Sequence, residues 1–325
     1  MAKPEGRRGS QGRIRKLSGC WTRLKGMTQP RQILPGRSYL VTRRTTQRQF
    51  LLRPSRATNE NVKFCLGLAA ERTGVVLHAV CVMSNHWHGV VTDPEARLPE
   101  FIECFHKLLA KAQNALLGRW ENLWSSDKTS VVLLTSEHDV LDKMAYTLAN
   151  PTTAGLVKCP EEWPGLISAR FGEQSETEMP DTFFDDDGDL PDSSELQIVR
   201  PQIFRSLSDD ELYARLRDDV AARVRAARAE MTRRGASFRG RESILRQSFD
   251  ASPKTEAPRR NVSPRVSGAS IVERIAAIRR LCEFVRCYRA ARQEWREGNR
   301  DKIFPAGTYA LRVHGGVPCD DAVPD

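Results

Sequence analysis

The stretch VVLHAVCVMSNHWHGVVT, residues 75–92, decides the fold. Residues 75–83 are a run of β-branched and apolar residues, which is typical of a buried strand. Ser84 and Asn85 are turn-forming residues, and residues 86–92 are again rich in β-formers. The two segments are therefore predicted to pair as an antiparallel hairpin.

Further strands and helices surround this hairpin along the chain. Strands of this kind, alternating with amphipathic helices, predict an α+β fold, in which a ferredoxin-like antiparallel sheet carries helices on one face. Hydrophobic spacing and turn residues set the limits of each element. The expected elements are a strand over 38–42, a helix over 59–72, a helix over 99–117, a short strand over 131–134 and a helix over 136–149 that Ser136 and Asp139 cap.

Two histidines share one face of the second hairpin strand. Side chains alternate along a strand, so His86 and His88 point to one side and Trp87 points to the other, into a helix layer. Two imidazoles at this spacing can hold one divalent cation. An H-x-H triplet also arises by chance, so the pair alone leaves a structural role open. The remaining histidines have no partner at ligand spacing and are interpreted as packing or surface residues.

The helix over 136–149 carries a tyrosine on its polar side. Its apolar stripe is formed by Leu141, Met144 and Leu148, and Tyr146 points away from that stripe. Asn150 lies four residues later and therefore on the same side as Tyr146. The residue before a proline avoids the α conformation, so the helix is expected to end at Asn150, before Pro151. An ordinary surface tyrosine is the alternative interpretation.

The charge of the chain is positive and unevenly distributed. The 325 residues carry 51 Lys and Arg against 41 Asp and Glu, a formal net charge of +10. This excess favours a polyanionic partner, of which nucleic acid is the commonest, although a basic surface can also serve solubility alone. No stretch reaches the ~20 apolar residues of a membrane span. The eight cysteines are scattered without a CxxC motif, which indicates reduced thiols in a cytoplasm.

Charge and composition also divide the chain into segments. Residues 1–26 are basic and are predicted to form a disordered arm, unless translation begins at Met27. Residues 173–195 hold ten acidic residues and no Lys or Arg, which predicts a solvated linker. Two amphipathic helices, over 208–234 and 270–297, then predict a mostly helical module that adds DNA affinity or serves structure and dimerisation. The expected domains are the arm over 1–26, a first globular domain over 27–172, the acidic linker over 173–195 and a basic helical domain over 196–325.

Several separated motifs resemble one known family, the single-tyrosine HUH transposases, and in particular the REP-associated tyrosine transposases. The resemblance covers roughly residues 30–172. The matching segments are PGRSYLVTR (35–43), HAVCVMSNHWH (78–88), Ala145-Tyr146, NPTTAGLV (150–157) and the stretch from Trp163-Pro164 to Ser168.

This resemblance implies an HUH nuclease fold and a mechanism. His86 and His88 correspond to metal ligands, Asn150 to a polar third ligand, and Tyr146 to the nucleophile that forms a 5′-phosphotyrosine link. The implied cofactor is Mg²⁺ or Mn²⁺. The implied partner is single-stranded or hairpin DNA, with the protein acting as monomer or homodimer in a bacterial cytoplasm, at the nucleoid. Basic residues expected to contact DNA phosphates are Arg37, Arg43, Arg44 and Arg48.

Two other functions remain open from the sequence. One is a sequence-specific DNA-binding regulator in which the catalytic site is vestigial. The other is a metal-dependent nuclease that activates water and forms no covalent intermediate. Because His86, His88, Tyr146 and Asn150 are all present, the sequence favours the transposase over a decayed site.

Overall fold

The computed structural model describes residues 30–183, 188–254, 265–268 and 270–321. The basic arm expected over 1–26, and with it the choice between the two start codons, lies outside these residues. The described chain forms two compact units. Residues 35–274 form the larger unit, and residues 30–34 with 275–321 belong to the smaller one.

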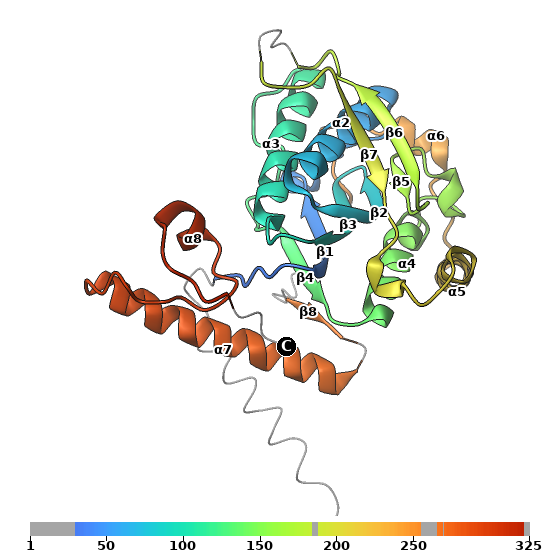
Figure 1. Ribbon diagram of the computed structural model, residues 1–325. Helices are drawn as coiled ribbons and strands as arrows, with labels where there is room; N and C mark the ends of the chain where they lie inside the picture. The colour runs from blue at the N-terminus through green and yellow to red at the C-terminus, as the bar shows by residue number, and fades with distance from the viewer. Residues whose placement is uncertain (1–29, 184–187, 255–264, 269, 322–325) are drawn as a thin grey trace, which may run out of the picture. The chain divides into compact units, whose positions relative to one another are not determined.

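A mixed β-sheet is the centre of the larger unit (Figure 1). Its order is β6-β7-β2-β3-β1-β4-β8, and β5 pairs with β2 outside this path. The middle strands β2, β3, β1 and β4 run antiparallel to one another, as the sequence predicts, whereas the outer strands β7 and β8 pair in parallel with β2 and β4. These four strands are β1 (Arg37–Arg44), β2 (Val76–Met83), β3 (His86–Asp93) and β4 (Ser130–Leu134).

The predicted hairpin over 75–92 is confirmed. Met83 pairs with His86, and Ser84 and Asn85 form the turn between them. The register shifts once, between Leu77 and Ala79. Strand β1 pairs with β3 along its full length, and this pairing ends with Arg44 opposite His86. The turn end of the hairpin and the end of β1 therefore lie together.

Helices cover both faces of the sheet, and this corrects the expectation that they lie on one face. Helices α2 (Arg56–Thr73) and α3 (Leu98–Leu116) pack on the face that includes Val41 and Trp87, whereas α4 (Glu137–Thr153) packs on the face that includes Leu40 and Val90. Strands buried on both faces read as continuous apolar runs rather than alternating ones. The runs in β1 and β2 have this form, so the α+β class is confirmed with a second helix layer.

The acidic segment over 173–195 forms strands instead of the expected linker. Strands β6 (Glu173–Glu178) and β7 (Ser193–Ile198) pair antiparallel, and Ile198 pairs in parallel with Leu77 of β2. Only alternate residues of β7 are buried, because its other side faces solvent. Charged residues on that exposed side conceal the strand pattern. The sheet thus extends across the expected domain boundary.

Residues 196–274 also belong to the unit that contains the sheet. Helix α5 (Asp209–Arg233) begins with a capping box formed by Ser208 and Glu211 and packs on α4. The helix over 208–234 is confirmed, but its partner is the sheet unit rather than a separate C-terminal domain. The remaining short elements here are β5 (Ile167–Ser168), α6 (Arg241–Leu245), β8 (Val266–Ser267) and three 3-10 turns at Thr46–Arg48, Pro160–Glu162 and Gln202–Phe204.

The smaller unit is built on the long helix α7 (Ile271–Arg296), close to the predicted limits of 270–297. Its core contains Ala291, Phe304 and Val317. The short helix α8 (Ala310–Gly315) follows, and Gln32 forms a β-bridge with Thr308. This unit keeps the helical character that the sequence predicts for the end of the chain.

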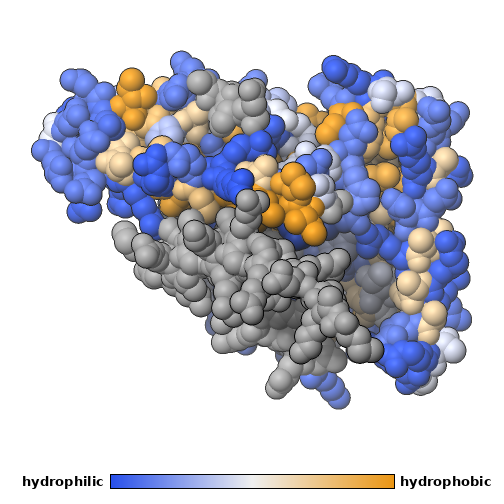
Figure 2. All heavy atoms as spheres, turned by 90° about the horizontal axis from the view of Figure 1, so that it is seen from below, coloured by the Kyte–Doolittle hydropathy of each residue, from blue (hydrophilic) through white to orange (hydrophobic). Residues whose placement is uncertain are grey.

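The surface is polar, in agreement with the high content of charged residues. On the face seen in Figure 2, apolar side chains form small groups among hydrophilic ones. None of the described helices is both long and apolar enough to cross a membrane. Every cysteine in the described ranges is a free thiol.

Candidate functional site

The two histidines of the HWH motif lie on the face of β3 that α4 covers. Their rings are in edge contact, with centroids 4.7 Å apart. Trp87 points to the opposite face, where it is fully buried and donates its indole N–H to His106 Nε2 at 3.0 Å. The predicted division of this triplet between two faces is therefore confirmed, and it follows from strand geometry alone.

Both ring nitrogens of His88 have polar neighbours. Thr42 Oγ1 lies 2.9 Å from Nδ1, and the side-chain amide nitrogen of Asn150 lies 3.1 Å from Nε2. An amide N–H only donates, so Nε2 accepts and carries a lone pair, while Nδ1–H donates to Thr42. His88 is thereby fixed in one tautomer, whose Nε2 lone pair faces α4.

His86 has the same tautomer for a different reason. Its Nδ1 lies 2.7 Å from Asn85 Oδ1, an oxygen that accepts the Nδ1–H proton and leaves Nε2 unprotonated. Burial lowers the pKa of His86 to about 4, and the nearby charges of Arg44 and Arg48 act in the same direction. Burial lowers the pKa of His88 well below its usual value as well. Both imidazoles are therefore neutral at pH 7, the form that binds a metal ion.

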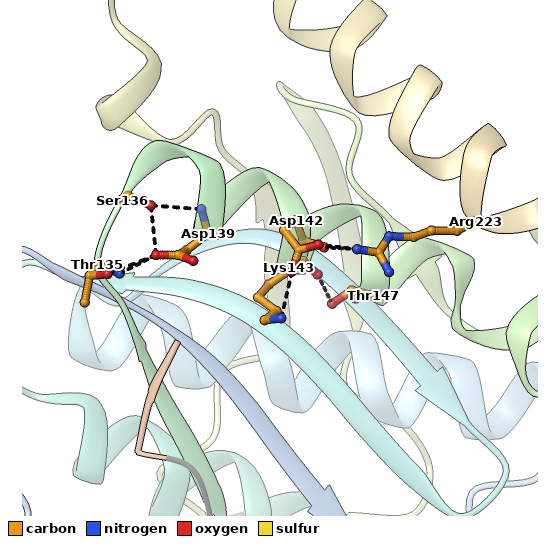
Figure 3. Close-up of polar contacts among 7 residues, drawn as sticks. All are labelled: Thr135, Ser136, Asp139, Asp142, Lys143, Thr147 and Arg223. Carbon is orange, nitrogen blue, oxygen red and sulfur yellow. Dashed lines mark hydrogen bonds and ion pairs between the residues drawn. The ribbon is translucent and has the colours of Figure 1, made fainter. Parts of the chain in front are cut away.

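Helix α4 is held firmly at its start and along one side (Figure 3). Ser136 accepts the Asp139 backbone N–H, and the Asp139 carboxylate accepts hydrogen bonds from Ser136 and Thr135. One turn later, Asp142 forms an ion pair with Arg223 of α5. These contacts fix the rotation of α4, and with it the direction in which its polar side faces the sheet.

Tyr146 lies on that polar side, against the histidine pair. Its ring is in edge contact with the His88 ring, with centroids 5.3 Å apart. Burial raises the pKa of Tyr146 above its usual value, while Asn150, Arg44 and Arg223 act to lower it. The Tyr146 phenol is therefore protonated at neutral pH, because the effect of burial exceeds that of the nearby groups that favour the phenolate.

The end of α4 differs from the prediction. The helix continues through Pro151 to Thr153 and is followed by Gly155, which has the left-handed φ of 71°. Proline lacks an N–H, but this costs one hydrogen bond only, at a position close to the helix end. Because Asn150 remains helical, it stays on the same side as Tyr146, so the predicted juxtaposition of these two residues holds.

The donor set at this point suits a divalent cation. The two neutral imidazoles and the Asn150 amide are nitrogen and oxygen donors of the kind that Mn²⁺ accepts. Turning the amide over exchanges its nitrogen and oxygen and directs the oxygen to the side of His88 Nε2. Within the described ranges, no group of three or more His, Cys, Asp and Glu could hold a metal ion. The pair with Asn150 is therefore the arrangement to consider.

Of the four arginines predicted to contact DNA, two lie near the histidine pair and two do not. Arg44 is opposite His86 in the sheet, and it and Arg48 are close enough to lower the pKa of His86. Arg37 is at the other end of β1. The Arg43 side chain bonds to Thr129 Oγ1 and the Ser125 carbonyl. Only Arg44 and Arg48 are thus brought to the histidine pair.

Three residues of the site were not selected from the sequence. Thr42 and Asn85 set the tautomers of the histidines, and Arg223 holds α4 through Asp142. The strand pairing of β1 with β3 would have indicated Thr42, which is opposite His88. No sequence signal indicates Arg223, because it lies 77 positions after Tyr146, in a helix that packs on α4 only in the folded chain.

Comparison with known proteins gave two structural neighbours. No protein-family model matches the chain, and no curated protein matches it. A REP-associated tyrosine transposase bound to a REP hairpin is 18% identical, with a TM-score of 0.35 over 43% of this chain and 81% of that chain. A presumed transposase of Deinococcus radiodurans R1 is 22% identical, with a TM-score of 0.27 over 34% of this chain and 88% of that chain.

Proposed function

We propose that the protein is a metal-dependent transposase and endonuclease that cleaves and rejoins single-stranded DNA near hairpins. The observation that carries the proposal is the contact of the Tyr146 ring with His88, whose Nε2 also meets Asn150. A nucleophile, two neutral imidazoles and an amide share one site. This combination suits phosphoryl transfer to a tyrosine better than it suits a purely structural role.

The proposed reaction is a transesterification. The Tyr146 oxygen attacks the phosphorus of a DNA phosphodiester and forms a phosphotyrosine bond to the 5′ end of the downstream fragment. The bond to the 3′ oxygen breaks, and that oxygen leaves as a 3′ hydroxyl that takes up a proton. Attack by a 3′ hydroxyl on the phosphotyrosine reverses these changes and rejoins a strand. No bond energy is lost, so no nucleotide cofactor is required.

Residues around Tyr146 assist its ionisation. Tyrosine is a poor nucleophile while protonated, with a pKa near 10 in water. Arg44 and Arg223 favour the phenolate, as does the hydrogen bond from Asn150. Arg44 is exposed at the end of β1, where it is also able to contact a DNA phosphate.

His86, His88 and Asn150 would hold the Mg²⁺ or Mn²⁺ ion. When bound, this ion supplies positive charge that polarises the scissile phosphate and stabilises the charge that develops on it. Asn85 and Thr42 accept the Nδ1–H of His86 and of His88, so the Nε2 lone pair of each ring is available to the ion. Such partners of metal-ligating histidines orient the rings and increase their basicity.

The test follows each half of a cleaved strand. The full-length protein is incubated with Mn²⁺ and single-stranded hairpin DNA from repeats beside the gene, labelled at the 3′ end or at the 5′ end. On a denaturing gel, the 3′ label is expected to move with the protein and the 5′ label to appear as a shorter free fragment. Both products are expected to disappear with EDTA.

Variants separate the proposal from its rivals. Tyr146→Phe is expected to abolish cleavage, while Tyr213→Phe, which removes a hydroxyl bonded to the Phe171 backbone, is expected to cleave like the wild type. Cleavage that persists in Tyr146→Phe would favour the water-activating nuclease. Binding of every hairpin without cleavage would favour the DNA-binding regulator with a vestigial site.

A further inference from the structure

A pocket lies on the face of the sheet opposite to the histidine pair. It has a volume of about 490 Å³ and lies between α3 and the segment that follows it. Its lining includes Lys107 and Lys111 of α3, Trp120, Trp124 and Arg43. A volume of this size falls in the range of small-molecule sites. The lining combines aromatic rings with positive charge.

Trp120 is the most unusual residue of this pocket. It is 92% exposed, the highest value among the exposed large apolar side chains of the described chain. The neighbouring Trp124 is fixed, because its indole N–H donates to the His106 carbonyl at 2.9 Å and its ring packs against the His106 ring. Leaving an indole in water forgoes the apolar burial that large aromatic side chains otherwise gain. The Trp124 ring is therefore fixed in the wall of the pocket, whereas the neighbouring Trp120 ring is exposed to solvent.

Two polar atoms in the lining lack a hydrogen-bond partner in the described structure. They are Arg43 Nε, a donor, and Asn114 Oδ1, an acceptor. The other nitrogens of Arg43 bond to Thr129 and Ser125, and the Asn114 amide nitrogen bonds to the Glu121 carbonyl at 2.7 Å. Both atoms are covered by surrounding protein atoms and do not reach the open part of the pocket.

The charge of the pocket favours an anion. Lys107 and Lys111 are one helical turn apart and exposed, and neither forms an ion pair within the part of the chain that the structure describes. Glu121, the acidic residue in the lining, is in an ion pair with Arg119 at 3.6 Å. The lining therefore offers uncompensated positive charge beside a free aromatic ring.

The pocket is connected to the end of β1 that carries the histidine site. The Ser125 backbone N–H donates to the Arg44 carbonyl, the Thr46 N–H donates to the Leu123 carbonyl, and Thr45 forms a bridge with Trp124. Arg44 is opposite His86. The segment that lines the pocket is therefore attached to the end of β1 at which Arg44 lies.

We propose that this pocket binds one nucleotide of a single-stranded nucleic acid, with the base stacked on Trp120 and the adjoining phosphates held by Lys107 and Lys111. A π-face with flanking cations matches a nucleobase on its phosphate backbone. The inference rests on the proposed function for the identity of the strand. Its test requires no cleavage, so the two proposals can fail separately.

The test is binding of a fluorescein-labelled oligo-dT of about 12 nucleotides, a length within known site sizes. Fluorescence anisotropy is measured with the full chain carrying Tyr146→Phe, which prevents any cleavage. Adding Trp120→Ala is expected to weaken binding about tenfold, whereas Trp120→Phe keeps a ring and most of the affinity. Ile203→Ala, which truncates another exposed apolar side chain, is expected to have no effect.

The salt dependence of binding tests the lysines. Lys107→Ala with Lys111→Ala is expected to reduce the slope of log affinity against log salt by about 1.4, which corresponds to two single-strand phosphate contacts. The control, Lys158→Ala with Lys254→Ala, removes the same charge from two other exposed positions and is expected to leave the slope unchanged. An equal loss of slope in both double variants would mean that Lys107 and Lys111 act only through the overall charge of the protein, and it would overturn their assignment as phosphate contacts.

Crosslinking supplies an independent result. An iodouracil-substituted strand, irradiated in the complex, is expected to attach to the peptide that contains Trp120. Crosslinks elsewhere, together with wild-type affinity of Trp120→Ala, would overturn the proposal. A change in oligomeric state in Trp120→Ala, without any change in DNA affinity, would overturn it too and assign the exposed indole to a protein contact.

Discussion

Acid is expected to destabilise this protein strongly, because four of its histidines are held neutral. Burial lowers the pKa of His78 and His86 to about 4 and that of His106 to about 3, and it lowers the pKa of His88 well below the usual value. All four lie in the unit formed by residues 35–274. The unfolded chain has no such burial, so its histidines titrate near pH 6.5.

The sign and size follow from this difference. Between pH 6.5 and pH 4 the unfolded chain binds more protons than the folded one, so stability is present above that window and is lost as the pH falls through it. From about pH 7 to about pH 5.5, each histidine lowers the free energy of unfolding by about 1.2 kcal/mol. Four histidines amount to about 5 kcal/mol, which is comparable to the whole stability of many domains.

Urea unfolding at pH 7 and pH 5.5, in EDTA, measures this loss. Carboxylates ionise mostly below this window, so they contribute little. His106→Gln keeps an acceptor for the Trp87 N–H and is expected to reduce the pH-dependent loss by about a quarter. His138→Gln, at an exposed histidine, is the matched control and is expected to leave the loss unchanged. A total loss below about 1 kcal/mol would refute the reasoning, because it would mean that the buried histidines bind protons as readily as unfolded ones.

Three further outcomes can be checked. Gly89→Ala is expected to lower the free energy of unfolding by about 1–3 kcal/mol, because a Cβ at this position would lie 2.6 Å from the Trp87 ring; an unchanged denaturation midpoint would contradict this packing. Arg223→Ala removes the ion pair with Asp142 and is expected to lower the free energy of unfolding by about 1 kcal/mol, and calorimetry that shows no loss would make the pair irrelevant to α4. At roughly 100 times its Kd, Mn²⁺ is expected to raise the Tm of the wild type by about 5–10 °C and leave His88→Ala unchanged, whereas an equal rise in both would contradict the metal site.

The central elements could be predicted from the sequence because local signals specify them. The apolar runs on either side of Ser84-Asn85 specify the hairpin, and the Ser136 cap specifies the start of α4. The histidine pair and Tyr146 could be selected for the same reason, since strand and helix periodicity determine which side chains share a face. The contact between Tyr146 of α4 and the histidines of β3 depends on how the helix packs on the sheet, and the sequence resemblance alone suggested it.

The remainder depends on contacts between distant segments. Strands β6 and β7 carry acidic residues because one side of each faces solvent, and their pairing with the sheet is set by Leu196 and Ile198 in the core. Gly67 of α2 allows β7 to approach closely, since a Cβ there would lie 2.8 Å from the Glu195 backbone. Neither fact is visible in the local composition. The position of α5 is likewise not visible in the local sequence, because its apolar residues pack against α4, which is distant in the chain.

The alternation of three consecutive residues in β1 limits how the length of this strand can change. Thr42 and Arg44 face the histidines, and Arg43 faces the opposite side. Insertion or deletion of one residue inside β1 would turn every later side chain to the wrong face. Arg43 would then enter the histidine site, and His88 would lose its threonine partner. Diverging copies of this protein should therefore vary in length before Gly36 or after the turn at Thr46–Arg48, but not between them.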